Sequence, residues 1–284
     1  MAARAISLTL ILTAAIASSP AAADPFTFSN GNVNNLIAVA SRPSTASQFE
    51  IEAADDFVLS TRTQITSASF TGLLPTGVSP SSVSSITVEF YRVFPNDSNV
   101  GRTSGPPTFS TPQVPTRVNS PSDVALDSRD LGSGLSLHSE LLGAFSVDNT
   151  VVNGLSVGAG GEGPATGDQV LLQAQFTTPF DLAAGHYFIV PQVGLTSGQF
   201  LWLSAARPIV GGTPFNPDLQ SWMRNADLDP DWLRLGTDIV GGTTFNASFT
   251  LTGTAVPEPG TLGLCATGLV ALLTTGYRRR RRAD

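Results

Sequence analysis

The stretch "DQVLLQAQF", residues 168–176, alternates apolar and polar side chains along its length. One face would carry Val170, Leu172, Ala174 and Phe176, and the other Gln169, Gln173 and Gln175. Successive side chains of a β-strand point to opposite faces, so this period of two predicts a strand with one buried face and one polar face.

Similar alternation occurs in residues 48–53, 85–94 and 246–254. Residues 185–193 and 199–205 are almost continuously apolar, which is typical of strands at the centre of a sheet. Turn-forming residues separate these segments, and helical periodicity is visible only in residues 218–227, "DLQSWMRNAD". Many short strands joined by turns predict an all-β fold. We expect an antiparallel, jelly-roll-like β-sandwich over residues 24–254, as one domain.

Charge and cysteine content exclude several classes of protein. Residues 24–256 contain nine arginines, no lysine and 20 acidic residues, a formal charge of 9 − 20 = −11. Such a surface repels nucleic acid, so no nucleic-acid partner is expected, and it attracts cations such as calcium. The only cysteine is Cys265, so the predicted domain is not a disulfide-stapled scaffold.

The N-terminus has the features of a secretory signal peptide. Arg4 precedes a short apolar run, and Ala21, Ala22 and Ala23 supply the small residues that a signal peptidase requires. We therefore expect residues 1–23 to be a signal peptide that is cut after Ala23. The alternative is an uncut membrane anchor.

The C-terminus has the features of a membrane segment. Thr261–Tyr277 contains no charged residue, and as a helix it would be about 26 Å long, against about 30 Å for the hydrocarbon core of a bilayer. Five consecutive arginines, Arg278, Arg279, Arg280, Arg281 and Arg282, follow it. Because such a cluster stays on the cytoplasmic side, the domain before it would lie outside, as the signal peptide also requires.

The order of features in residues 255–284 resembles the PEP-CTERM sorting signal. The motif Val256, Pro257, Glu258, Pro259 precedes the apolar segment and the basic tail of residues 278–282. The resemblance implies a transmembrane segment at about 261–277, recognised and removed by an exosortase. It also implies sorting to the cell surface or extracellular matrix of an exopolysaccharide-producing bacterium. Signal peptidase and exosortase would be partners during export. A plain single-pass anchor is the alternative.

One acidic segment has the spacing of a calcium loop. Asp227, Asp229 and Asp231 alternate, and Asp238 follows, but Trp232 stands where an EF-hand loop needs glycine. A looser calcium site is therefore the expectation, with a solvated acidic loop as the alternative. Trp222 and Trp232 flank this segment and could stack on sugar rings, or could pack in the interior.

Catalytic motifs are sparse. Glu50 and Glu52 would share one strand face, where neighbouring carboxylates are usually solvated. The only histidines are His138 and His186, and no G-x-S-x-G motif surrounds a serine. We therefore expect a non-catalytic structural or adhesive protein, exported and biofilm-associated, with exopolysaccharide as a potential partner. The alternatives are a calcium-assisted carbohydrate-binding module and, third, a polysaccharide-active hydrolase.

Overall fold

The computed structural model describes residues 24–98, 119–206, 219–225, 229–242 and 244–256, together with Gly268. Residues Asp24–Val256 form a compact unit of their own. The predicted signal peptide, the basic tail and the predicted transmembrane segment except Gly268 lie outside the described residues. Within the described ranges, none of the helices is long and apolar enough to span a bilayer.

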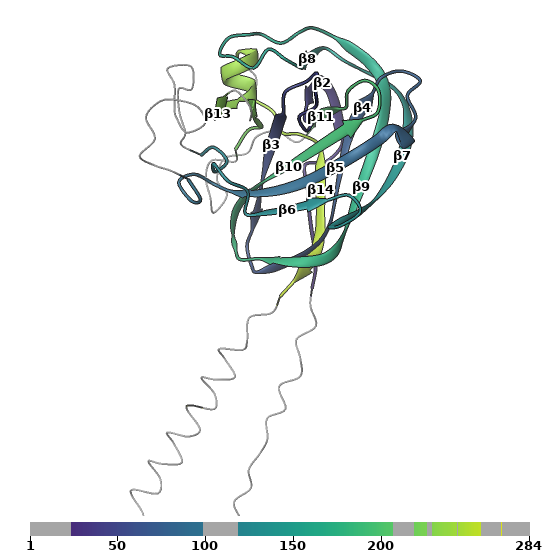
Figure 1. Cartoon of the computed structure of the whole chain (residues 1–284). Helices are drawn as coiled ribbons and strands as arrows, with labels where there is room; N and C mark the ends of the chain where they lie inside the picture. The colour runs from purple at the N-terminus through teal and green to yellow at the C-terminus, as the bar shows by residue number, and fades with distance from the viewer. Residues whose placement is uncertain are drawn as a thin grey trace, which may run out of the picture. The chain divides into compact units, whose positions relative to one another are not determined.

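The described part of the chain is all-β, as predicted, and its strands form two sheets (Figure 1). The first sheet has eight strands. Along its main path these are β1 (Pro25–Ser29), β14 (Phe249–Ala255), β4 (Thr63–Leu74), β11 (Leu201–Ala205), β2 (Val33–Ala40) and β8 (Asn149–Val151). On the other side of β4 lie β9 (Ala165–Leu182) and then β7 (Leu135–Val147). The pair β2 and β8 is parallel, so this sheet is mixed rather than purely antiparallel.

The second sheet has six strands. In spatial order they are β13 (Asp229–Arg234), β12 (Trp222–Asn225), β3 (Ile51–Leu59), β10 (Gly185–Leu195), β5 (Val83–Arg92) and β6 (Asp127–Asp130). A short 3-10 helix, η1 (Pro80–Ser82), precedes β5, and a π-helix, η2 (Leu235–Val240), follows β13. Figure 1 shows β13 and β7 at opposite sides of the unit.

The two sheets face each other across one apolar core. Phe57 of β3 meets Phe249 of β14, with ring centroids 6.5 Å apart, and Phe90 of β5 meets Phe176 of β9 at 5.9 Å. All four rings are buried, and this is the distance range in which aromatic pairs attract. The alternating strands predicted from the sequence therefore do turn their apolar positions inward.

A buried carboxylate adds a polar link between the sheets. Asp55 of β3 is fully buried, and its Oδ2 accepts hydrogen bonds from Asn30 Nδ2, at 3.1 Å, and from the backbone N–H of Ala247. Asn30 directly follows β1, and Ala247 precedes β14. Since a buried carboxylate is costly without such donors, these bonds fix β3 against the start of β14.

The helix predicted for residues 218–227 is wrong where the structure describes that range. Residues Trp222–Asn225 form strand β12, which pairs with β3 on one side and β13 on the other. The backbone hydrogen bonds to two neighbouring strands outweigh a short helical pattern, because a helix of so few residues is only marginally stable by itself.

The outer face of the six-stranded sheet is covered. Tyr91, Phe188, Val190, Trp222 and Trp232 form a second apolar cluster there, with Leu219 packed against them. The segment that connects β5 with β6 crosses this face at Ser122, whose backbone N–H bonds to Arg92 O at 2.9 Å. Polar residues of these strands are therefore enclosed, although their alternation predicts a solvated face.

Candidate functional site

The acidic segment predicted to bind calcium has another role at Asp238. Its carboxylate accepts hydrogen bonds from Arg234 Nη2, at 2.6 Å, from Arg234 Nε, and from the Arg234 backbone N–H at 2.9 Å. The side chain of Asp238 is only 6% exposed. It stabilises the start of η2 and is not available as an open calcium ligand, so the prediction is corrected at this residue.

Two of the other predicted calcium ligands lie in a strand rather than in a loop. Asp229 and Asp231 belong to strand β13, and Asp227 lies outside the described residues. Within the described part of the chain, there is no group of three His, Cys, Asp or Glu side chains that could hold a metal ion.

The predicted sugar contacts at Trp222 and Trp232 are also corrected. The two residues are 2% and 3% exposed, because they fill the apolar cluster on the outer face of the six-stranded sheet. Trp232 Nε1 donates to the carbonyl of Ser122 at 3.1 Å, which fixes the ring against the covering segment. Neither indole presents a face on which a sugar could stack.

A charged cluster that the sequence analysis did not predict lies in the same enclosed layer. Arg224 of β12 forms an ion pair with Glu52 of β3, and its guanidinium stacks on Trp232, 4.5 Å from the ring centroid. The hydroxyl of Tyr91 lies 3.0 Å from Glu52 Oε1 and 2.9 Å from Glu89 Oε2. Strand pairing brings these residues together, since Arg224 stands opposite Glu52 in the register of β12 and β3.

The two carboxyl groups of the cluster compete for one hydroxyl donor. One Tyr91 hydroxyl can donate to only one of its two carboxylate neighbours, so a proton on the other carboxyl satisfies the second contact. Burial, together with the nearby charge of Glu52, raises the pKa of Glu89 to about 7. Burial and the Glu52 charge also raise the pKa of Tyr91, so its hydroxyl keeps its proton. We therefore expect Glu89 to hold the extra proton at pH values below about 7.

The cluster is closed to substrate in the described structure. Glu52 is 3% exposed and Arg224 is 7% exposed, and Arg224 Nη1 also donates to the carbonyl of Asp123 in the covering segment. Two carboxyl groups that hydrolyse a glycosidic bond must flank an open site. The arrangement instead matches an internal charge network, in which each ion is held by hydrogen bonds and stacking.

A hollow of about 720 Å³ lies at one end of the six-stranded sheet and reaches His186. His186 Nε2 is 2.6 Å from Asp56 Oδ2, both side chains are almost fully buried, and the imidazole stacks on Phe188. A carboxylate-oriented histidine is one part of a hydrolytic triad, which also needs a nucleophile. None of the described residues that line the hollow is Ser, Thr or Cys.

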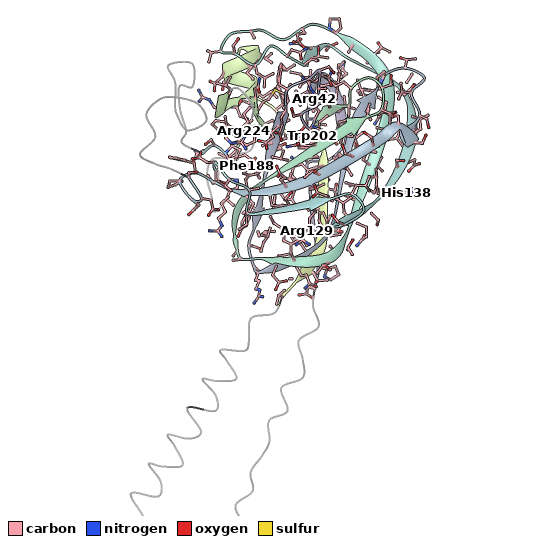
Figure 2. All side chains as sticks on the ribbon, viewed as in Figure 1. Arg42, Arg129, His138, Phe188, Trp202 and Arg224 are labelled. Atoms are coloured by element: carbon pink, nitrogen blue, oxygen red, sulfur yellow. The ribbon has the colours of Figure 1, made fainter. Side chains whose placement is uncertain are left out.

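The sequence did carry a partial signal for the charged cluster. Alternation places Glu50 with Glu52 on one face and Glu89 with Tyr91 on another. Alternation within each strand could not show that these two strands lie in one sheet with the four side chains on the same side. It also could not show that residues 120–126 cover that side. Figure 2 shows Arg224 and Phe188 on the same side of the unit, away from His138.

Comparison of the chain with protein-family models, with curated proteins and with solved structures gives no match. The PEP-CTERM resemblance of residues 255–284 therefore stays a prediction. What the chain does is inferred below from its own residues.

Proposed function

We propose that this chain is an exported protein, sorted through its C-terminal PEP-CTERM-like signal and displayed at the cell surface or in the extracellular matrix. In this proposal the domain is a jelly-roll-like β-sandwich with a non-catalytic, structural or adhesive role. A signal helix would precede it, and a transmembrane helix would follow it.

The observation that carries the proposal is the pairing of the first and last strands. β1 and β14 are antiparallel neighbours, and Pro25 stands opposite Thr254. The backbone N–H of Ala255 donates to Asp24 O at 2.8 Å, so the first residue after the predicted cleavage site lies beside the residue before the sorting motif. Both predicted membrane signals would thus join the domain at one end, and the rest of its surface would be free for display.

Two further features support the non-catalytic part of the proposal. The Glu52 carboxylate is buried and Glu89 is only partly exposed, and no Ser, Thr or Cys is among the described residues that line the hollow at His186. The core is built without cysteine between residues 24 and 256, so its stability does not depend on oxidation outside the cell.

The test is to express the full chain in an exopolysaccharide-producing bacterium that has an exosortase, and to fractionate the cells. We expect mature protein at the surface, beginning at Asp24 and lacking the C-terminal tail by mass spectrometry. The double variant Pro257→Ala, Pro259→Ala should keep the tail and stay in the membrane fraction, as should the unchanged chain in a host without exosortase.

Two outcomes would contradict the proposal. A chain that begins at Met1 and stays in the cytoplasm would refute export. A surface chain that begins at Asp24 but keeps its tail in the presence of exosortase would refute sorting and indicate a plain anchor.

A further inference from the structure

The outer face of the eight-stranded sheet carries a regular array of uncharged polar side chains. Phe70, Leu172 and Phe249 point into the core, so their neighbours in β4, β9 and β14 point outward. Pairing registers join these outward residues into a row across five strands. The row consists of Ser29, Thr250, Ser69, Gln173 and His138.

A second row runs beside the first, two residues further along each strand. It consists of Thr27, Thr252, Ser67, Gln175 and Ser136. With about 4.8 Å between strands and about 6.7 Å between rows, the array spans about 19 by 7 Å. All ten side chains are partly or fully exposed.

The surface of the array contains hollows, and hydrogen bonds within the protein orient some of its polar groups. Two adjoining hollows of about 340 and 500 Å³ lie on this face and share Ser69 and Thr250 in their linings. The Ser29 and Thr250 hydroxyls lie 2.8 Å apart, and Gln175 Nε2 donates to the carbonyl of Thr66 at 3.0 Å. Because these contacts fix the hydroxyls and an amide beforehand, less freedom is lost when a ligand binds.

The chemistry of the array indicates its ligand. The domain carries a formal charge of −11, yet neither row contains an acidic residue or an arginine. Hydroxyl and amide groups both donate and accept hydrogen bonds, and the two ring nitrogens of an imidazole can also donate or accept. A polymer of neutral sugars presents the same mixture of donors and acceptors, and it has no charge that must be paired.

We infer that this face binds an extended, neutral polysaccharide, lying across strands β1, β14, β4, β9 and β7. Binding here involves hydroxyl and amide contacts, and it uses neither calcium nor the two interior tryptophans. The inference deepens the proposed function, because it names what the displayed domain would hold. Figure 2 shows His138 at the surface on the side of this face, opposite Arg224.

The test is electrophoresis of the folded protein through native gels that contain a dissolved polysaccharide. The probes are hydroxyethyl cellulose, galactomannan and dextran, with alginate as the anionic control. Both the full chain in mild detergent and the compact unit 24–256 are run. We expect at least one neutral polysaccharide to retard both proteins, with the same retardation in EDTA and none by alginate.

Two double variants test the face itself. Gln173→Glu with Gln175→Glu keeps side-chain shape but places two charges on the array, and should weaken binding at least tenfold. Thr250→Val with Thr252→Val keeps the branched β-carbon but removes two hydroxyls, and should also weaken binding about tenfold, because ligand groups that met those hydroxyls lose their hydrogen-bond partners. The matched control is Gln48→Glu, the same change in the loop before β3, which should bind as the unchanged chain does.

Three results would overturn the inference, and none of them depends on export. Absence of retardation by all three neutral polysaccharides, or equal retardation of the unchanged and double-variant proteins, would overturn the inference. Sedimentation could also overturn it, by showing that the unchanged protein forms concentration-dependent dimers and that the Gln173→Glu, Gln175→Glu variant stays monomeric. The face would then be a contact between two copies of the chain. Failure of export would appear only in cell fractionation, because the binding assay uses purified protein.

Discussion

Glu89 links the stability of the unit to pH through a single, partly buried side chain. Its pKa is raised from an ordinary value of 4.5 to about 7, first by burial and then by the charge of Glu52, while Tyr91 and Arg224 oppose the shift. The folded chain therefore holds this proton where the unfolded chain has lost it. The resulting stabilisation is complete below pH 4.5 and is lost as pH rises through about 7.

We expect Glu89→Gln to remove this part of the pH dependence. The glutamine amide can accept from Tyr91 without carrying a charge, so the free energy of unfolding should change less between pH 5 and pH 8 than in the unchanged chain. Urea unfolding at several pH values measures it. The control is Glu140→Gln, which removes an exposed carboxylate from β7. Equal pH dependence in the Glu89 variant and the unchanged chain would show that Glu89 is ionised in the fold.

Strand β4 needs a glycine at position 72, where strand β11 comes close to it. It pairs with β14 along most of one edge and with β11 at its end, where Gly72 stands opposite Trp202. A β-carbon on Gly72 would lie 2.2 Å from the Phe200 ring and 2.6 Å from the Leu201 carbonyl oxygen. The backbone of β11 can approach β4 only because residue 72 is glycine.

We therefore expect Gly72→Ala to destabilise the unit by about 1–3 kcal/mol, the usual cost of overpacking. Thermal unfolding with a structure-sensitive signal measures the change. Gly154→Ala is the matched control, because its added carbon would lie 3.6 Å from its nearest contacts and should change stability by less than about 0.5 kcal/mol. An unchanged melting temperature for Gly72→Ala would mean that β4 and β11 separate easily.

The elements also show where sequence patterns stop being informative. Period-two alternation predicted β5, β9 and β14 and their buried faces, because one face of each strand packs on the common core. The pattern failed at residues 222–225, which are a strand through their pairing with β3. The glycine-rich residues 158–163 carry no periodic pattern, although the backbone N–H groups of Gly158 and Gly160 donate to the carbonyls of Asp238 and Ile239 in η2.

The candidate sites failed for a related reason. Asp238, Trp222 and Trp232 have side chains suited to binding, and only their neighbours decide that they are interior groups instead. Arg234 lies four residues before Asp238, whereas Ser122 and Arg224 contact Trp232 from the covering segment and from the neighbouring strand β12. The ten-residue polar array was missed for the opposite reason. Its residues are ordinary one by one, and only strand register assembles them into rows.

At the scale of the whole molecule, the pairing of β1 with β14 brings the first and last residues of the unit next to each other. A hydrogen bond of 2.8 Å from the Ala255 backbone N–H to Asp24 O links the two ends, so a short linker could connect them. Domains with adjacent ends commonly tolerate circular permutation when new ends open in an exposed turn. Ser197 and Gly198, between β10 and β11, are such a turn.

We expect a permutant of residues 24–256 to fold, with a short Gly-Ser linker joining Val256 to Asp24 and new ends between Ser197 and Gly198. Its melting temperature should lie within a few degrees of that of the unpermuted unit, because every strand pair is kept. The control is the unpermuted unit with the same linker inserted between Ser197 and Gly198. If the control folds and the permutant does not, the two ends lie too far apart for a short linker. That result would contradict the pairing of β1 with β14 and, with it, the single attachment point on which the display proposal rests.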